Sequence, residues 1–198
     1  MPGPFSGLSV KLIATIALVI FAVEAVVYVP SAVNFRQSWL NDRLRIGIVA
    51  ARVLDAVPDA MNLPAMLTNN LLTSAGAVAL VYRRNGQSQL IERDDMPMPR
   101  EAVTIDMRQT DFPTLAMGLT DTLLHAGQRN IRILGNSDGS DALSEVEVVM
   151  DEAPLYADVI RFSFSVALIY LLIAVMTAAV LFLVLSRLLI TPIRRLTE

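Results

Sequence analysis

The stretch that decides the architecture is FSFSVALIYLLIAVMTAAVLFLVL, residues 162–185, which contains no charged side chain. About 20 apolar residues are enough for a helix to cross the hydrocarbon core of a bilayer. The run is followed by Ser186 and Arg187, and then by ITPIRRLTE at 190–198, so it ends in a basic tail. Basic residues beside a membrane helix favour its cytoplasmic side. We therefore predict a transmembrane helix over residues 161–185 whose C-terminal end is cytoplasmic.

A second apolar run, residues 10–29, lies close to the N-terminus. It is long for the apolar part of a signal peptide, and Val23-Glu24-Ala25 is a poor cleavage site, so we predict a retained transmembrane helix. Residues 1–9 are then a short cytoplasmic tail. Glu24 is either a functional intramembrane carboxylate or a side chain that reaches water in the headgroup zone.

The charges are unevenly distributed along the chain. Residues 30–161 hold 17 acidic and 12 basic residues, whereas both ends are short and basic. By the positive-inside rule, both termini are predicted to be cytoplasmic, and the segment between the two apolar runs is long enough to be translocated whatever its charge. The chain has no cysteine, which excludes disulfides and thiol chemistry. No basic patch appears outside the tail, so we expect no nucleic-acid partner.

The segment between the two runs changes from a helical to a strand pattern. Asn85-Gly86 is a strong hairpin signal. Five short strands with few helices predict an α+β domain built on an antiparallel sheet of about five strands. The predicted helices cover 30–58, 65–74 and 112–125, and the predicted strands cover 77–83, 87–93, 102–108, 130–134 and 144–150.

Two patterns predict which side chains are buried. In strand 144–150, we expect Val146, Val148 and Met150 to point inward and the intervening glutamates outward. Helix 30–58 either continues the first membrane helix or restarts at Pro30. It carries two adjoining apolar stripes, of which one comprises Phe35, Trp39, Ile46, Val49, Val53 and Val57, and the other Leu40, Leu44 and Ile48.

The last helix is predicted to begin directly after a strand. Asp151, Glu152 and Pro154 form an N-terminal helix signature, with acids first and proline in the first turn. Because nothing in the sequence breaks the helix between 155 and 189, strand 144–150 is expected to be coupled mechanically to the second membrane helix.

The order of these segments, together with short motifs, carries a resemblance. LLITPIRRL at 188–196 is similar to the start of the first helix of a HAMP linker. The stretch 24–44, with YVPS at 28–31 and DRL at 42–44, looks like alphaproteobacterial sensor kinases. The element order of 30–160 is similar to PAS-like, single-Cache sensor folds. The chain thus resembles the N-terminal input half of a HAMP-containing bacterial sensor histidine kinase.

The resemblance implies a homodimer in the bacterial inner membrane, with residues 30–160 as a periplasmic sensor domain. It also implies that this domain receives an unknown ligand or stimulus and relays it through the HAMP start, residues 186–198. The residues that the resemblance assigns to signal transmission are Leu189, Pro192, Arg194, Arg195 and Leu196. ATP, magnesium and a response regulator would belong to a downstream kinase core. We expect the chain to be the N-terminal part of a longer protein or a natural truncation.

No catalytic residue is predicted in this chain, and whether the whole protein is an enzyme stays open. The single histidine, His125, precedes Ala126-Gly127 instead of the acid and proline that follow a phospho-accepting histidine in that family. His125 is either a pH sensor or the C-terminal cap of a helix. No cofactor or metal site is expected.

Four side chains are candidate contacts for a ligand or a cation. Arg83 and Arg108 either bind an anion or are ordinary surface arginines on strands. Asp151 and Glu152, close to the second membrane helix, either hold a cation or cap the helix. Two other functions stay open: the input module of a chemotaxis receptor or a cyclic-di-GMP cyclase, and a two-span accessory protein without signalling output.

Overall fold

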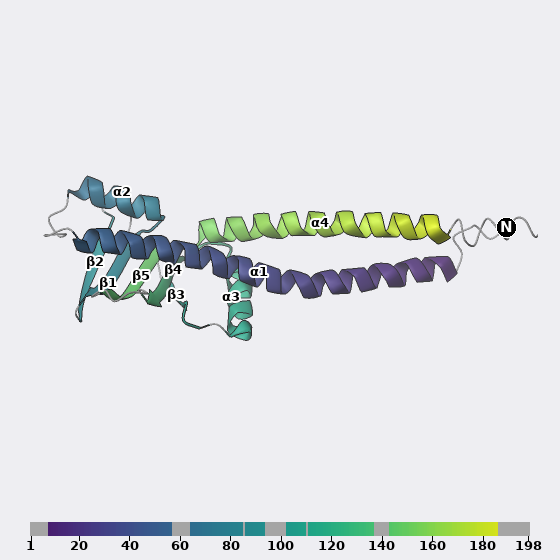
Figure 1. The fold of residues 1–198 in the computed structure, drawn as a ribbon, viewed down its shortest axis with the longest axis horizontal. Helices are drawn as coiled ribbons and strands as arrows, with labels where there is room; N and C mark the ends of the chain where they lie inside the picture. The colour runs from purple at the N-terminus through teal and green to yellow at the C-terminus, as the bar shows by residue number, and fades with distance from the viewer. Residues whose placement is uncertain are drawn as a thin grey trace, which may run out of the picture. The chain divides into compact units, whose positions relative to one another are not determined.

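The computed structural model describes residues 8–56, 64–84, 86–93, 102–109, 111–136 and 143–185. Two compact units make up the chain: a helical unit, Met1–Ser31 with Arg161–Glu198, and a sheet unit, Ala32–Ile160. The elements in order are α1 (Leu8–Ala56), α2 (Ala65–Ala75), β1 (Ala79–Arg84), β2 (Gln87–Glu92), β3 (Ala102–Asp106), α3 (Phe112–His125), β4 (Asn130–Asn136), β5 (Leu143–Asp151) and α4 (Ala153–Leu185) (Figure 1).

The five strands form one sheet in the order β2-β1-β5-β4-β3. The α+β class and the β1–β2 hairpin are confirmed, and Gly86 supplies the positive φ of 82° that the turn requires. Three of the four strand pairs are antiparallel, but β3 and β4 are parallel, so the prediction of a fully antiparallel sheet is wrong for this pair. The reason is α3, which lies between β3 and β4 in sequence and provides the crossover that parallel neighbours need.

One face of the sheet is packed under α1, as Figure 1 shows. Val146, Val148 and Met150 are buried, as the alternation in β5 predicted. Two glycines allow the close approach: a Cβ at Gly47 of α1 would overlap Val148, and one at Gly135 of β4 would overlap Leu44 of α1. The core of the sheet unit therefore lies between α1 and the central strands.

The first helix is continuous through Pro30, so the restart is not seen and Ser31 Oγ donates to Val27 O within the helix, at 2.8 Å. Of the two predicted stripes, the one with Leu40 and Leu44 is buried. The exposed stripe comprises Ile46, Val49 and Val53, which are 41%, 59% and 47% exposed.

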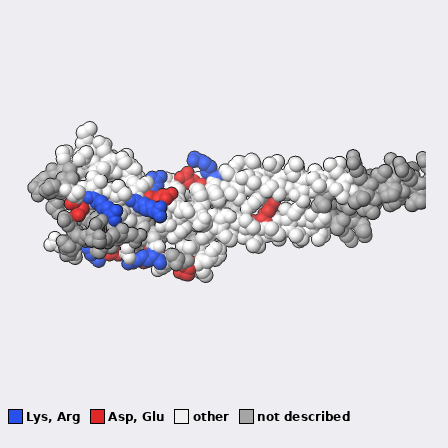
Figure 2. All heavy atoms as spheres, viewed as in Figure 1, with Lys and Arg blue, Asp and Glu red and all other residues white. Residues whose placement is uncertain are grey.

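The opposite face of the sheet is polar. Arg83 of β1 lies 3.1 Å from Glu145 of β5, and Arg132 of β4 lies 3.6 Å from Glu147. These side chains are partly exposed, and surface ion pairs of this kind contribute little to stability. In Figure 2, charged side chains gather over the sheet unit, whereas the long apolar helices are nearly free of charge in that view.

Two helices are long and apolar enough to cross a membrane, over Leu18–Ala56 and Ala153–Val180. Within the helical unit, Tyr28 Oη of α1 lies 2.6 Å from Ser163 Oγ of α4. The Oε1 atom of Glu24 is buried and has no hydrogen-bond partner in the described part of the chain. The predicted HAMP start, residues 186–198, lies outside the described residues.

Candidate functional site

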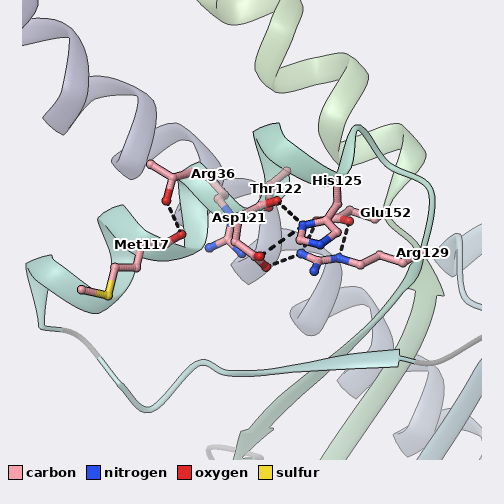
Figure 3. A network of polar contacts seen from close by, with 8 residues as sticks. Arg36, Met117, Asp121, Thr122, His125, Arg129 and Glu152 are labelled. Carbon is pink, nitrogen blue, oxygen red and sulfur yellow. Dashed lines mark hydrogen bonds and ion pairs between the residues drawn. The ribbon is translucent and has the colours of Figure 1, made fainter.

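A polar network joins three elements of the sheet unit at the point where β5 passes into α4 (Figure 3). Glu152 lies between the two elements and is fully buried. Arg129, in the segment before β4, donates from Nε to Glu152 Oε2 at 2.8 Å and from Nη2 to Glu152 Oε1 at 3.3 Å. The same Nη2 donates to Asp121 of α3. One guanidinium therefore ties α3 to the first turn of α4.

The local sequence explains why Arg129 reaches Glu152. Helix α3 ends at His125 and is followed by Ala126 and Gly127, both at positive φ. A Cβ at Gly127 would lie 2.7 Å from Ala153 Cα, so the chain reversal packs directly on the start of α4. The backbone N–H of Glu152 then donates to the carbonyl of Arg129 at 3.0 Å. The backbone thus places both side chains of the ion pair side by side.

A second arginine enters the network from α1. Arg36 is 4% exposed, and its Nε donates to Thr122 Oγ1 of α3 at 3.1 Å. Burial lowers the pKa of Arg36, and the carboxylates of Glu152 and Asp121 oppose this effect. Thr122 is completely buried next to Asp121, so neighbouring α3 residues contact two different arginines.

Asp121 is the shared acceptor on the exposed side of the network. Its hydrogen bond from Arg129 holds the pKa of Asp121 below its ordinary value. Burial by itself would lower the pKa of Arg129, but its hydrogen bonds to Glu152 and Asp121 outweigh that effect and raise it. His125 is the last residue of α3, and its Nδ1 lies 2.9 Å from the carbonyl oxygen of Asp121, one turn earlier in the helix. The C-cap residue itself is Ala126.

The two arginines that the sequence singled out meet on the polar face of the sheet, away from this network. Arg83 lies 3.1 Å from Glu145 Oε2, and Arg108 lies 3.7 Å from Glu145 Oε1. Arg108 also donates to both carboxylate oxygens of Asp106, at 2.8 and 2.9 Å. Hydrogen bonds from Arg108 lower the pKa of Asp106. Both arginines are thus engaged with carboxylates of this chain.

The acids near α4 take different positions. Asp151 is exposed and accepts from the backbone N–H of Ala153 at 2.9 Å, which is the capping role. Glu152 is the buried partner of Arg129, and Asp158 accepts from Trp39 Nε1 at 3.0 Å. Across the described residues, no group of three or more histidines, aspartates or glutamates is arranged to hold a metal ion. The predicted transmission residues, 189–196, lie outside the described part of the chain.

Sequence reasoning missed Arg36, Asp121, Thr122 and Arg129. A signal was present for Arg36, because positions 36, 40 and 44 follow one another at steps of four on the buried stripe of α1. A charged residue at a position whose helical neighbours are apolar indicates a buried, functional or structural charge. Nothing in the sequence pairs Arg129 with Glu152, since the contact depends on the chain reversal after α3.

Comparison of the chain with protein-family models, with curated proteins and with solved structures found no match.

Proposed function

We propose that the chain is the stimulus-receiving and signal-transmitting half of a HAMP-containing sensor histidine kinase of the bacterial inner membrane. In this proposal both termini are cytoplasmic and the sheet unit is a PAS-like periplasmic sensor. Two helices of sufficient length and apolar character support it, as do the basic residues at both ends. The kinase core, with its ATP, magnesium and response regulator, lies downstream in the proposed whole protein.

The observation that carries the proposal is the connection between β5 and α4. Strand β5 ends at Asp151 and α4 begins at Ala153, so no flexible linker separates the sheet from the long apolar helix. Arg129 pairs both with Glu152 at this junction and with Asp121 of α3, and so connects the junction to α3. Packed elements joined in this way move between discrete arrangements instead of deforming continuously. A shift of α3 would thus be passed to the first turn of α4.

We also propose a homodimer that uses the exposed face of α1. Ile46, Val49 and Val53 form an apolar stripe there, and Met66 and Leu67 are exposed on α2. Contiguous exposed apolar side chains mark interaction surfaces in soluble domains. A second copy would bury the stripe and would also supply the partner helices that a HAMP coiled coil requires.

The test is an activity measurement on the full-length protein in proteoliposomes. Pro192→Ala, and separately Leu189→Asp, are expected to change basal autophosphorylation and its response to stimulus. Arg132→Gln, which alters only an exposed ion pair on the polar face of the sheet, is the matched control. If both variants keep normal activity and a normal response, α4 is not the transmission element.

The same variants separate the rival functions. In a chemotaxis receptor or a cyclic-di-GMP cyclase, they would change receptor methylation or cyclase activity in place of autophosphorylation. In an accessory protein without output, neither variant would change any of the three activities. Alkaline phosphatase fused after residue 136 tests the orientation, because the enzyme is active only on the periplasmic side.

A further inference from the structure

An open cleft of about 490 Å³ lies within the sheet unit, between α1, β3 and α3. Sites for small organic ligands usually enclose about 300–1,000 Å³ and combine apolar walls with a few convergent polar groups. The cleft is distinct from the Glu145 ion pairs, and none of the four ligand or cation candidates from the sequence lines it. Arg36 of α1 is among the polar residues that line it.

Among the residues that the structure describes, none is a charged partner of Arg36 at hydrogen-bond distance. Its one hydrogen bond in the described part of the chain is from Nε to the neutral Thr122 hydroxyl. The guanidinium extends past Gly118 of α3, where a Cβ would lie 2.8 Å from Arg36 Nη1. Gly118 thus leaves room for the outer nitrogens of the guanidinium beside the cleft. Glu152 and Asp121 act on the charge of Arg36 without a direct hydrogen bond to it. Buried charges normally have a directly bonded partner, so a buried arginine that lines a cleft without one indicates a site for an anion.

The geometry of the group restricts the anion. The two outer nitrogens of a guanidinium form a planar fork that suits two parallel hydrogen bonds to a carboxylate or a phosphate. Asp106, Asp121 and Arg129 also line the cleft. Together with Arg36 they carry two charges of each sign, so the cleft has no excess of positive charge and suits a singly charged carboxylate better than a doubly charged phosphate.

The remaining walls restrict the rest of the ligand. Leu115, Met117 and Leu124 of α3 line the cleft together with Val103 and Ile105 of β3. Met117 and Leu124 are 71% and 82% exposed, so an apolar group seated there would remove their surface from water. Figure 3 shows Arg36 extending from α1 toward α3, the helix that also carries Met117.

From this juxtaposition we infer that the cleft binds a small organic monocarboxylate, with the carboxylate on Arg36 and the apolar part against α3 and β3. Binding would act on α3 between Arg36 and the Arg129–Glu152 pair, since Thr122 and Asp121 are neighbours on that helix. A role of this ligand as the stimulus rests on the proposed signalling function, whereas binding itself does not.

The test uses the complete chain in detergent with methionine labelled at its ¹³C-methyl group. The Met117 resonance, assigned with Met117→Leu in a separate sample, reports on the cleft. Benzoate and butanoate are the probes; benzamide and inorganic phosphate are the neutral and the doubly charged controls. We expect the carboxylates to shift the Met117 signal saturably and both controls to leave it in place.

Arg36→Lys keeps the charge but removes the fork, and is expected to weaken carboxylate binding at least about tenfold. Val103→Trp, at an exposed wall position, should block binding while leaving Arg36 in place, which covers the case that the Arg36 variant misfolds. Arg132→Lys is the control and should bind as the unaltered chain does.

Three results would overturn the inference: an unmoved Met117 signal with both carboxylates, a phosphate shift as large as the benzoate shift, or unchanged binding in Arg36→Lys. Each leaves the signalling proposal standing, since that proposal is tested by kinase output. Conversely, saturable carboxylate binding with an output that ignores Pro192→Ala would retain the site and reject the signalling role.

Discussion

Replacing Arg129 by methionine should destabilise the sheet unit more than replacing Glu152 by glutamine. Glu152 is fully buried, whereas the Arg129 side chain is 15% exposed and has a second carboxylate partner, Asp121. Loss of Arg129 therefore leaves a buried carboxylate without its ion-pair partner, whereas loss of the Glu152 charge leaves Arg129 paired with Asp121. The two halves of one ion pair are expected to differ for this reason.

The expected loss of stability in Arg129→Met depends on how the buried Glu152 carboxyl responds when its partner is removed. Removing one partner of a buried ion pair typically costs about 3–5 kcal/mol. The carboxyl can instead take up a proton, and for an ordinary glutamate pKa of about 4.3 this costs about 3.7 kcal/mol at pH 7 and about 1 kcal/mol at pH 5. We therefore expect Arg129→Met to lose about 3–4 kcal/mol at pH 7. Glu152→Gln, which weakens charge-assisted hydrogen bonds, should lose about 2 kcal/mol.

The sign of the pH effect distinguishes this explanation from simple loss of packing. In Arg129→Met, the folded state holds the added proton more tightly than the unfolded state, so the variant loses stability as pH rises from 5 to 7. Arg129→Met combined with Glu152→Leu removes the stranded charge. This double variant should regain most of the lost stability and lose the pH dependence, because buried pairs replaced by apolar groups are often neutral in stability.

The assay is urea unfolding of the complete chain in detergent, followed by the emission of Trp39, the single tryptophan. Its Nε1 donates to Asp158 of α4 at 3.0 Å, so its environment reports directly on the packing of α1 against the start of α4 in the sheet unit. Equal losses in Arg129→Met and Glu152→Gln, or a loss that is the same at pH 5 and pH 7, would refute the reasoning.

Three further predictions concern other parts of the sheet unit. Val49→Cys should form a disulfide-linked dimer under mild oxidation, because a two-fold contact brings identical residues together. Ser88→Cys, at an exposed position on β2, is the control and should not form this dimer. Equal dimer yields from the two variants would reject the α1 dimer face. Gly47→Val should lower stability by about 2 kcal/mol, because its side chain would overlap the stiff Val148; an unchanged urea midpoint would contradict the close packing of α1. Folding lowers the pKa of Asp121, so the stabilising effect of its charge is complete above the ordinary aspartate pKa of about 3.9 and is lost as pH falls further. In Asp121→Asn, the free energy of unfolding should therefore depend less steeply on pH below about pH 4. An acid-unfolding transition identical to that of the unaltered chain would contradict this prediction.

The sequence could identify elements whose signals are local. Helix α3 was predicted over its observed range because the Asp111 cap, the early proline and the terminal glycine act on neighbouring residues. The β1–β2 hairpin and the inward side of β5 were likewise predictable, since a turn dipeptide and a two-residue alternation need no knowledge of distant chain.

Other features depend on which distant segments meet. Both stripes of α1 are apolar, and only packing against β5 decided that the Leu40 side is buried and the Val49 side exposed. The parallel β3–β4 pair follows from the crossover through α3, and the predicted order of strand, helix and strand already contains that signal.

The sequence by itself determined the two long apolar helices and the direct passage from β5 into α4, because hydropathy and capping are properties of contiguous residues. The tertiary structure alone decided the roles of Arg36, Arg129 and Glu152. Burial turns each of these charges into a group that must find a partner, and the partners lie 23 or more positions away along the chain. Glu152 thereby holds the start of α4 to Arg129, and Arg36 is buried among the residues that line the cleft.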